Sequence, residues 1–177
     1  IASWHAAVQM VLFHPGDLQL ATGSAEPRRA FLDRMLEQMD PTYASARASY
    51  EKALRSRNRL LKRPGADRRS ITAYDPILAS AGAVVGQTSR RLVGDLAPVA
   101  ERAMAEVVGE QLPLRIEYRP RVEPTVDAIR EALERSFARD LDRGFTAEGP
   151  HGDDLALEVR ERVPARHHAS QGQHRAI

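Results

Sequence analysis

The sequence predicts a mostly helical α+β fold with short strands near both ends of the chain. Apolar residues recur at helical spacing through most of residues 25–141. Residues 114–118, with the sequence LRIEY, instead alternate between apolar and charged side chains, as a half-buried strand does. A short apolar run at residues 8–13 is followed by the turn-forming sequence HPGD, which indicates a buried strand.

Length and composition suit one domain with a hydrophobic core. The chain has 177 residues, of which 42% are hydrophobic and 28% are charged. It contains no cysteine, which excludes disulfides and thiolate metal sites and favours a reducing compartment. The longest stretches without charge, residues 1–16 and 76–89, are shorter than a membrane span. We therefore expect a cytoplasmic protein with no membrane partner.

The first half of the chain predicts two successive helices. The first begins near Ala25 and ends at Asp40-Pro41. Its buried face is expected to hold Phe31, Leu32, Met35 and Met39. A longer helix follows over residues 42–62, and residues 63–67 (RPGAD) form an exposed connection.

The second half predicts further helices and strands. A helical pattern runs over residues 70–108, with a break at Gly94-Asp95, because Asp95 can cap a new helix whose first turn accommodates a proline. The apolar stripe expected to face the core there is Leu92, Leu96, Val99, Ala103 and Val107. The next helix carries the stripe Val126, Ile129, Leu133, Phe137 and Leu141, and Gly144 ends it. Residues 145–148 and 155–159 are predicted to be strands.

Basic residues gather between Arg47 and Arg69. Nine cations stand against Glu51 and Asp67 in this interval, a local charge of +7, whereas the whole chain carries +2. A solvated helix face is the ordinary explanation of such a run, but its single sign favours contact with nucleic-acid phosphates. The candidate DNA-binding residues are Arg47, Lys52, Arg55, Arg57, Arg59, Lys62 and Arg63. The high arginine content fits phosphate recognition and a GC-rich genome equally well.

A candidate phosphate-binding loop lies near the carboxyl end, at Ser170-Gln171-Gly172-Gln173. A serine hydroxyl and backbone N–H groups at the start of a helix can bind a phosphate. Gly172 would let the backbone approach such a group closely. By itself, this polar tetrapeptide fits an ordinary turn better.

Several blocks of the chain, taken in order, resemble the RecF family of DNA repair ATPases, which are relatives of the SMC and ABC heads. The blocks are residues 14–18 (HPGDL), 28–33 (RRAFLD), 53–62 (ALRSRNRLLK), 145–151 (FTAEGPH), 153–155 (DDL) and 169–173 (ASQGQ). The motif residues that follow from this resemblance are Gly149, Pro150, His151, Asp153 and Asp154. Three positions depart from the family's pattern: Gly16 stands for glutamate, Tyr74 for tryptophan and Gly152 for a basic residue.

The resemblance implies a helical arm, residues 25–112, inserted in an ABC-type ATPase head formed by residues 1–24 and 113–177. It implies that residues 170–173 are the signature loop, which contacts ATP held by the other subunit of a dimer, with Ser170 at the γ-phosphate. It also implies several partners: single-stranded or gapped DNA, a second copy in an ATP-dependent dimer, and RecO- and RecR-like mediators.

ATP hydrolysis requires residues that this chain lacks. A Walker A loop needs lysine followed by serine or threonine, but Lys52 precedes alanine and Lys62 precedes arginine. Asp153 and Asp154 follow GPHG rather than an apolar strand, so they do not form a Walker B site. We therefore expect a segment of a larger ATPase, inactive by itself, with Mg²⁺ held only through parts outside it. No catalytic or metal-binding residue is assigned.

Other interpretations stay open at this point. Asp153 and Asp154 could bind a metal, although a structural turn suits them better. His151 could be a general base, although a hydrogen bond within the turn is the simpler role. The chain could also be a stand-alone helical DNA- or protein-binding module derived from an SMC-like head. A RecN-like head is a third alternative, which the short arm disfavours.

Overall fold

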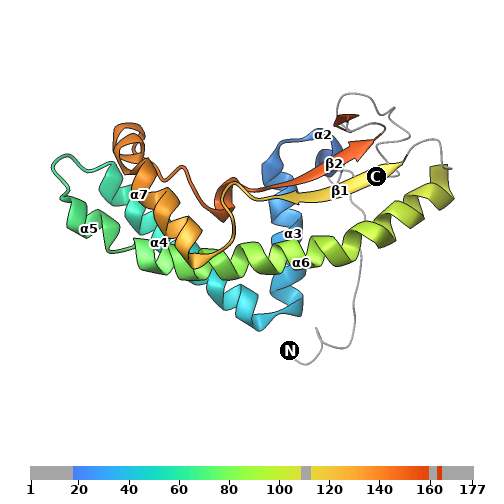
Figure 1. Ribbon diagram of the computed structural model, residues 1–177, viewed down its shortest axis with the longest axis horizontal. Helices are drawn as coiled ribbons and strands as arrows, with labels where there is room; N and C mark the ends of the chain where they lie inside the picture. The colour runs from blue at the N-terminus through green and yellow to red at the C-terminus, as the bar shows by residue number, and fades with distance from the viewer. Residues whose placement is uncertain (1–17, 109–112, 160–162, 165–177) are drawn as a thin grey trace.

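Helices make up most of the structure, together with one small antiparallel sheet (Figure 1). The computed structural model describes residues 18–108, 113–159 and 163–164. The helices are α2 (Leu18–Thr22), α3 (Ala25–Met39), α4 (Pro41–Leu61), α5 (Arg68–Thr72), α6 (Asp75–Val108), α7 (Val126–Arg143) and the 3₁₀ turn η2 (Pro150–Gly152). The strands are β1 (Leu114–Arg119), β2 (Asp154–Val159) and β3 (Val163–Pro164). The predicted α+β, mostly helical class is confirmed, whereas the predicted strand at 8–13 lies outside the described residues.

The long helix α6 connects the two ends of the molecule. Figure 1 shows α4, α5 and α7 gathered around its first half and the sheet lying along its second half. The strands are ordered β1–β2–β3, and the register pairs Leu114 with Val159 and Arg119 with Asp154. No helix in the described ranges combines the length and the hydropathy that crossing a bilayer requires.

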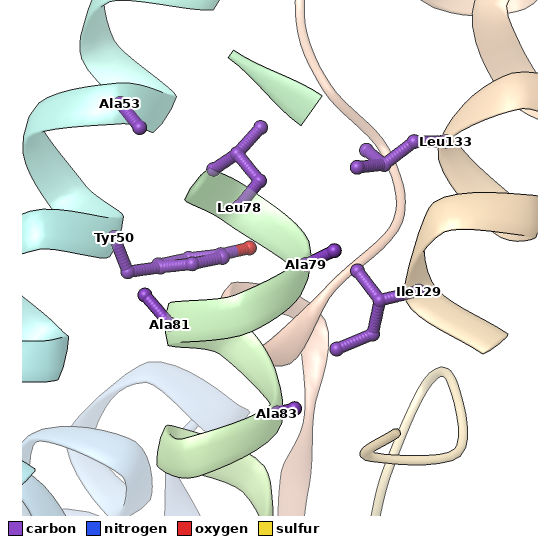
Figure 2. Close-up of a cluster of buried hydrophobic side chains, with 8 residues drawn as sticks. All are labelled: Tyr50, Ala53, Leu78, Ala79, Ala81, Ala83, Ile129 and Leu133. Atoms are coloured by element: carbon purple, nitrogen blue, oxygen red, sulfur yellow. The ribbon is translucent and has the colours of Figure 1, made fainter. Parts of the chain in front are cut away.

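The largest apolar cluster of the described residues joins α4, α6 and α7 (Figure 2). Its members are Tyr50 and Ala53 of α4, Leu78, Ala79, Ala81 and Ala83 of α6, and Ile129 and Leu133 of α7. Small residues on α6 let the other two helices approach closely. A Cβ at Gly82 would lie 3.1 Å from the Tyr50 ring and 3.3 Å from Ile129, so the packing leaves little room there.

Two predicted helix boundaries, at Asp40-Pro41 and at Gly144, are confirmed. Asp40 caps α4, since its Oδ1 accepts hydrogen bonds from the N–H groups of Thr42 (2.8 Å) and Tyr43 (3.2 Å). Gly144 ends α7 in the left-handed conformation, with a φ of 73°. The prediction that Met39 is buried is wrong, because that side chain is 62% exposed.

Helix α6 runs through the predicted break at Gly94-Asp95 and contains Pro98. An internal proline costs about 3 kcal/mol, so the continuity needs contacts on both sides of it. Val93 packs before the proline against Leu32 of α3 and Leu155 of β2. Met104 packs after it against the ends of β1 and β2. A boundary appears instead between α5 and α6, at residues 73–74.

The apolar stripe predicted for the second half of α6 is wrong in part. Val99 and Val107 are 53% and 71% exposed, and Ala103 is exposed too. In this half of α6 the apolar side chains that are buried against neighbouring elements are Val93 and Met104. The face turned to the sheet therefore lies next to the predicted one, because this part of α6 carries apolar residues on more than one side.

Candidate nucleic-acid interface and the adjoining motif loop

Helix α4 has two faces of different chemistry. The buried face repeats at helical spacing and consists of Tyr50, Ala53, Arg57 and Leu61. The opposite side, together with the residue that follows the helix cap, forms what we call the cationic face: Lys52, Arg55, Arg59, Lys62 and Arg63, all of them exposed. Arg55 pairs with Glu51 at 3.3 Å, whereas the other four side chains make no ion pair within the described residues.

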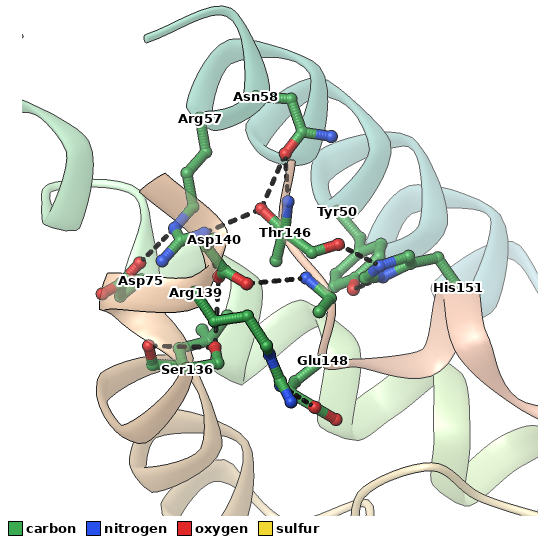
Figure 3. Close-up of polar contacts among 12 residues, drawn as sticks. Tyr50, Arg57, Asn58, Asp75, Ser136, Arg139, Asp140, Thr146, Glu148 and His151 are labelled. Carbon is green, nitrogen blue, oxygen red and sulfur yellow. Dashed lines mark hydrogen bonds and ion pairs between the residues drawn. The ribbon is translucent and has the colours of Figure 1, made fainter. Parts of the chain in front are cut away.

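Arg57 lies on the buried face, so the prediction that it binds DNA is wrong. Its side chain is fully buried, at 0% exposure. The guanidinium donates to Asp75 (2.9 Å), Asp140 (2.9 Å) and Thr146 Oγ1 (2.8 Å), as Figure 3 shows. Arg57 thereby ties α4 to α6, to α7 and to the loop after α7. Two carboxylates compensate its charge, and the guanidinium nitrogen without a partner, Nη2, is itself buried out of reach of a phosphate.

Arg47 is compensated in a similar way. It pairs with Asp33 at 3.2 Å, with Glu51 at 2.9 Å and with Glu37. Three carboxylates around one guanidinium cancel its attraction for a phosphate. Of the predicted DNA-binding residues, those whose side chains have no anionic partner in the described part of the chain are therefore Lys52, Arg59, Lys62 and Arg63.

The loop after α7 is held by side chains rather than by strand pairing. The Thr146 N–H donates to Asn58 Oδ1 at 2.8 Å, and the Ala147 N–H donates to Asp140 Oδ1 at 3.0 Å (Figure 3). These bonds occupy backbone donors that a strand would use. The predicted strand at residues 145–148 is therefore wrong, and a fixed loop leads into η2 instead.

His151 joins this loop to α4. Its Nε2 lies 2.9 Å from the Thr146 carbonyl oxygen, and its Nδ1 lies 2.6 Å from the Tyr50 hydroxyl. Because a carbonyl only accepts, we assign the proton to Nε2, so that Nδ1 accepts from Tyr50. Burial lowers the pKa of His151, and the nearby charges of Arg29 and Arg121 lower it further. The ring is thus neutral near pH 7 and has a structural role.

Only glycine fits at position 149, whereas at position 152 a neighbouring side chain occupies the space that a Cβ would need. Gly149 has a φ of 134°, and a Cβ there would collide with the Tyr50 hydroxyl. A Cβ at Gly152 would lie 2.5 Å from Cδ of Arg121. Arg121 therefore lies where a side chain at position 152 would begin. A basic side chain lies beside the motif although Gly152 supplies none.

Both aspartates of the motif, Asp153 and Asp154, bind other residues of the fold. Asp153 is 2% exposed and accepts from the Tyr118 hydroxyl and from the Arg121 N–H (2.7 Å). Burial raises the pKa of Asp153. Asp154 forms a two-pronged ion pair with Arg28, at 2.8 and 2.9 Å. These contacts favour the structural interpretation of the pair. The described ranges contain no group of three or more potential metal ligands.

Arg28 has a structural role in the fold. It is buried on α3, and its Nη1 also donates to the carbonyls of Leu20 (3.2 Å) and Gly23 (3.0 Å). It therefore ties the end of α2 to the start of β2. The candidate signature loop, Ser170, Gln171, Gly172 and Gln173, lies outside the described residues.

Comparison with known proteins identifies the family. No known family model matches the chain. The DNA replication and repair protein RecF of Myxococcus xanthus is 36% identical over 188 aligned positions, which cover 100% of this chain and 49% of the relative. The RecF protein of Acidothermus cellulolyticus is 38% identical and covers 94% of this chain and 48% of the relative. The chain belongs to the RecF family. It spans about half the length of the curated relatives it matches.

Solved RecF structures share the fold. One, described as the recombination mediator protein RecF with ATP in the RecFOR pathway, matches with a TM-score of 0.87 at 24% identity, over 96% of this chain and 48% of that chain. A second, described as RecF-ATPrS, matches with a TM-score of 0.84 at 27% identity, over 94% and 47%. The predicted likeness to part of an ABC/SMC-type ATPase is thereby confirmed at the level of the fold.

Proposed function

We propose that this chain supplies the DNA-binding arm and the ATP signature loop of a RecF-type recombination mediator. The observation that carries the proposal is the cationic face of α4. Four of its side chains, Lys52, Arg59, Lys62 and Arg63, have no anionic partner among the described residues. The homology to RecF proteins across the chain supports the same role.

The spacing of these cations is unfavourable unless an anion binds them. Arg59 stands three residues before Lys62, the cap of α4, so these two like charges lie on one side of the helix end and repel each other by a few tenths of a kcal/mol. From Lys52 to Lys62 the helix rises about 15 Å. A DNA backbone supplies closely spaced negative charges along such a length and releases counterions when it binds.

The ATP-related half of the proposal rests on the sequence of residues 169–173 and on the RecF relative that was solved with ATP. In this proposal residues 25–112 form the arm and residues 1–24 and 113–177 belong to the head. Ser170 contacts the γ-phosphate across a dimer, and Mg²⁺ is held by parts of the protein outside this chain. RecO- and RecR-like mediators are the partners that this family assignment suggests.

DNA affinity measured against salt tests the arm. The slope of log K against log salt falls by about 0.9 for each phosphate of duplex DNA that a cation no longer neutralises. Replacing both Arg59 and Lys62 by alanine should therefore reduce the slope by about 1.8 units. Arg34 and Arg102 are the matched control, because both are exposed cations on other helices with no ion pair to another described residue. An equal reduction in the control pair, or none in the test pair, contradicts the proposal.

ATP-driven association tests the loop. In a longer protein that also carries the Walker A and Walker B segments, Ser170→Ala should strongly weaken dimer formation in ATP, measured by sedimentation, and should leave the salt slope of DNA binding unchanged. Dimerisation at the wild-type level would count against the role of Ser170. Salt-dependent DNA binding with no response to ATP would support the alternative, a helical binding module without ATP chemistry.

A further inference from the structure

The aromatic ring of Phe145 is exposed near the carboxyl end of α4, where Lys62 of the cationic face lies. It is 45% exposed, although a ring of this size is usually placed in the core. Its neighbour Gly144 lies against α4, since a Cβ on Gly144 would be 3.3 Å from Cγ of Lys62. Arg143, on the other side of Gly144, is also exposed and has no ion pair in the part of the chain that the structure describes. An exposed ring is therefore close in the chain to Arg143 and follows a glycine that lies against Lys62, and neither cation has an ion-pair partner among the described residues.

The backbone that carries Phe145 is fixed on both sides. The Gly144 N–H donates to the Asp140 carbonyl at 2.8 Å. The Thr146 N–H donates to Asn58 Oδ1 at 2.8 Å, and the Thr146 hydroxyl donates to the same oxygen at 2.7 Å (Figure 3). Asn58 stands four residues before Lys62, so both face the loop from one side of α4. The backbone that carries the ring is thus ordered before binding, which lowers the conformational entropy that binding would cost.

The combination of ring and cations matches one class of ligand better than others. Single-stranded nucleic acid offers phosphates for the cations and an unpaired base for the ring, and stacked bases on aromatic side chains are a common means of holding single strands. An apolar protein surface would have to dehydrate Lys62 and Arg143 without compensating their charge. A duplex offers phosphates, but its bases are stacked on each other.

We propose that Phe145 stacks on an unpaired base of single-stranded DNA whose phosphates lie on Lys62, Arg143 and the cationic face of α4. This inference rests on the proposed function and narrows its substrate to strands with unpaired bases. The loop before residues 149–151 (GPH) would thus contribute base stacking to DNA binding, in addition to the charge of the cationic face.

Three probes of equal length separate stacking from charge in the purified protein: an oligo-dT strand, an abasic strand with the same phosphates, and a blunt duplex. Fluorescence anisotropy gives the affinity for each. Phe145→Ala should weaken oligo-dT binding about fivefold to a hundredfold, as removal of one stacked base does, and should change abasic and duplex binding less than about twofold. Phe145→Trp should restore oligo-dT binding, and Lys62→Ala should weaken all three.

The controls keep the outcomes distinct. Met39→Ala removes another exposed apolar side chain, before the opposite end of α4, and should change none of the affinities. Phe145→Leu keeps apolar volume without a ring and should behave as Phe145→Ala, which guards against an effect of folding. If Phe145→Ala weakens binding to oligo-dT and to abasic strands equally, or weakens neither, the stacking inference is wrong. The proposal that the cationic face binds DNA is then unaffected. A wild-type protein that binds none of the probes overturns both proposals.

Discussion

Removing the buried guanidinium of Arg57 should destabilise the protein severely without removing a contact to DNA phosphates. Arg57 makes three side-chain hydrogen bonds, to Asp75, Asp140 and Thr146. In Arg57→Ala the carboxylate of Asp140, which has 0% side-chain exposure, would lose its cation. A buried ion pair broken on one side costs about 3–5 kcal/mol, because the remaining charge stays buried without compensation. A domain of this size has a total stability of about 5–15 kcal/mol, so the loss should be readily measured.

The dependence of this loss on pH gives an independent check. Burial raises the pKa of Asp75, and Arg57 opposes that increase. Without Arg57 the pKa of Asp75 in the folded state should rise further above its unfolded value. A group with a raised pKa stabilises the fold at low pH and loses that contribution as pH rises through the folded pKa. The difference in unfolding free energy between wild type and Arg57→Ala should therefore be smaller at about pH 5 than at about pH 7.

Urea denaturation followed by circular dichroism measures both quantities. The matched control is Arg59→Ala, which removes the same side chain two residues later on the exposed face and should change stability by less than about 0.5 kcal/mol. Arg57→Lys keeps the charge but cannot reach three acceptors as a fork does, so its loss should be intermediate. A loss below about 1 kcal/mol in Arg57→Ala, or a selective loss of DNA affinity at wild-type stability, would refute the buried-pair interpretation.

Three further predictions concern a cap, two glycines and a histidine. Asp40→Ala should lower the unfolding free energy by about 1 kcal/mol, and Asp40→Asn by less, because asparagine keeps a capping oxygen for α4. Gly149→Ala should destabilise by about 1–3 kcal/mol because of its positive φ, whereas Gly94→Ala, in open space within α6, should stabilise by about 0.5–1 kcal/mol in the same denaturation assay. The pKa of His151 is lowered, so the unfolded state takes its proton first, and wild type should lose stability as pH falls below about 6.5. His151→Gln should lack this part of the pH profile, and parallel profiles for the two proteins would contradict it.

Features set by neighbouring residues could be predicted from the sequence. Asp40 followed by a proline marks the start of α4, and Gly144 marks the end of α7, because capping depends on a few adjacent backbone groups. The strand at residues 114–118 also shows in its alternation. These elements need no knowledge of the rest of the fold.

The buried side of α6 could not be predicted in the same way. Val99 and Val107 fit a helical stripe as well as Val93 and Met104 do, and only the position of the sheet decides between them. That position depends on β1 and β2 pairing across residues distant in the sequence. The continuity of α6 through Pro98 has the same origin, since local propensity favours a break there.

The burial of Arg57 did leave a trace in the sequence. Arg57 stands at helical spacing from Tyr50, Ala53 and Leu61, which are apolar, whereas Arg59 and Lys62 do not. The net charge of residues 47–69 does not distinguish Arg57 from the exposed cations. The identity of its acceptors could not be predicted, because Asp75 and Asp140 are 18 and 83 residues away.

The two faces of α4 allow the binding and the folding roles of this region to be separated by substitution. Asn58 and Tyr50 hold the motif loop through Thr146 and His151. The free cations contact none of these side chains through a hydrogen bond or ion pair in the described structure. A substitution on the cationic face should therefore change affinity while the loop keeps its geometry. A substitution on the buried face should change the loop first, and any effect on DNA binding would follow from the loss of structure.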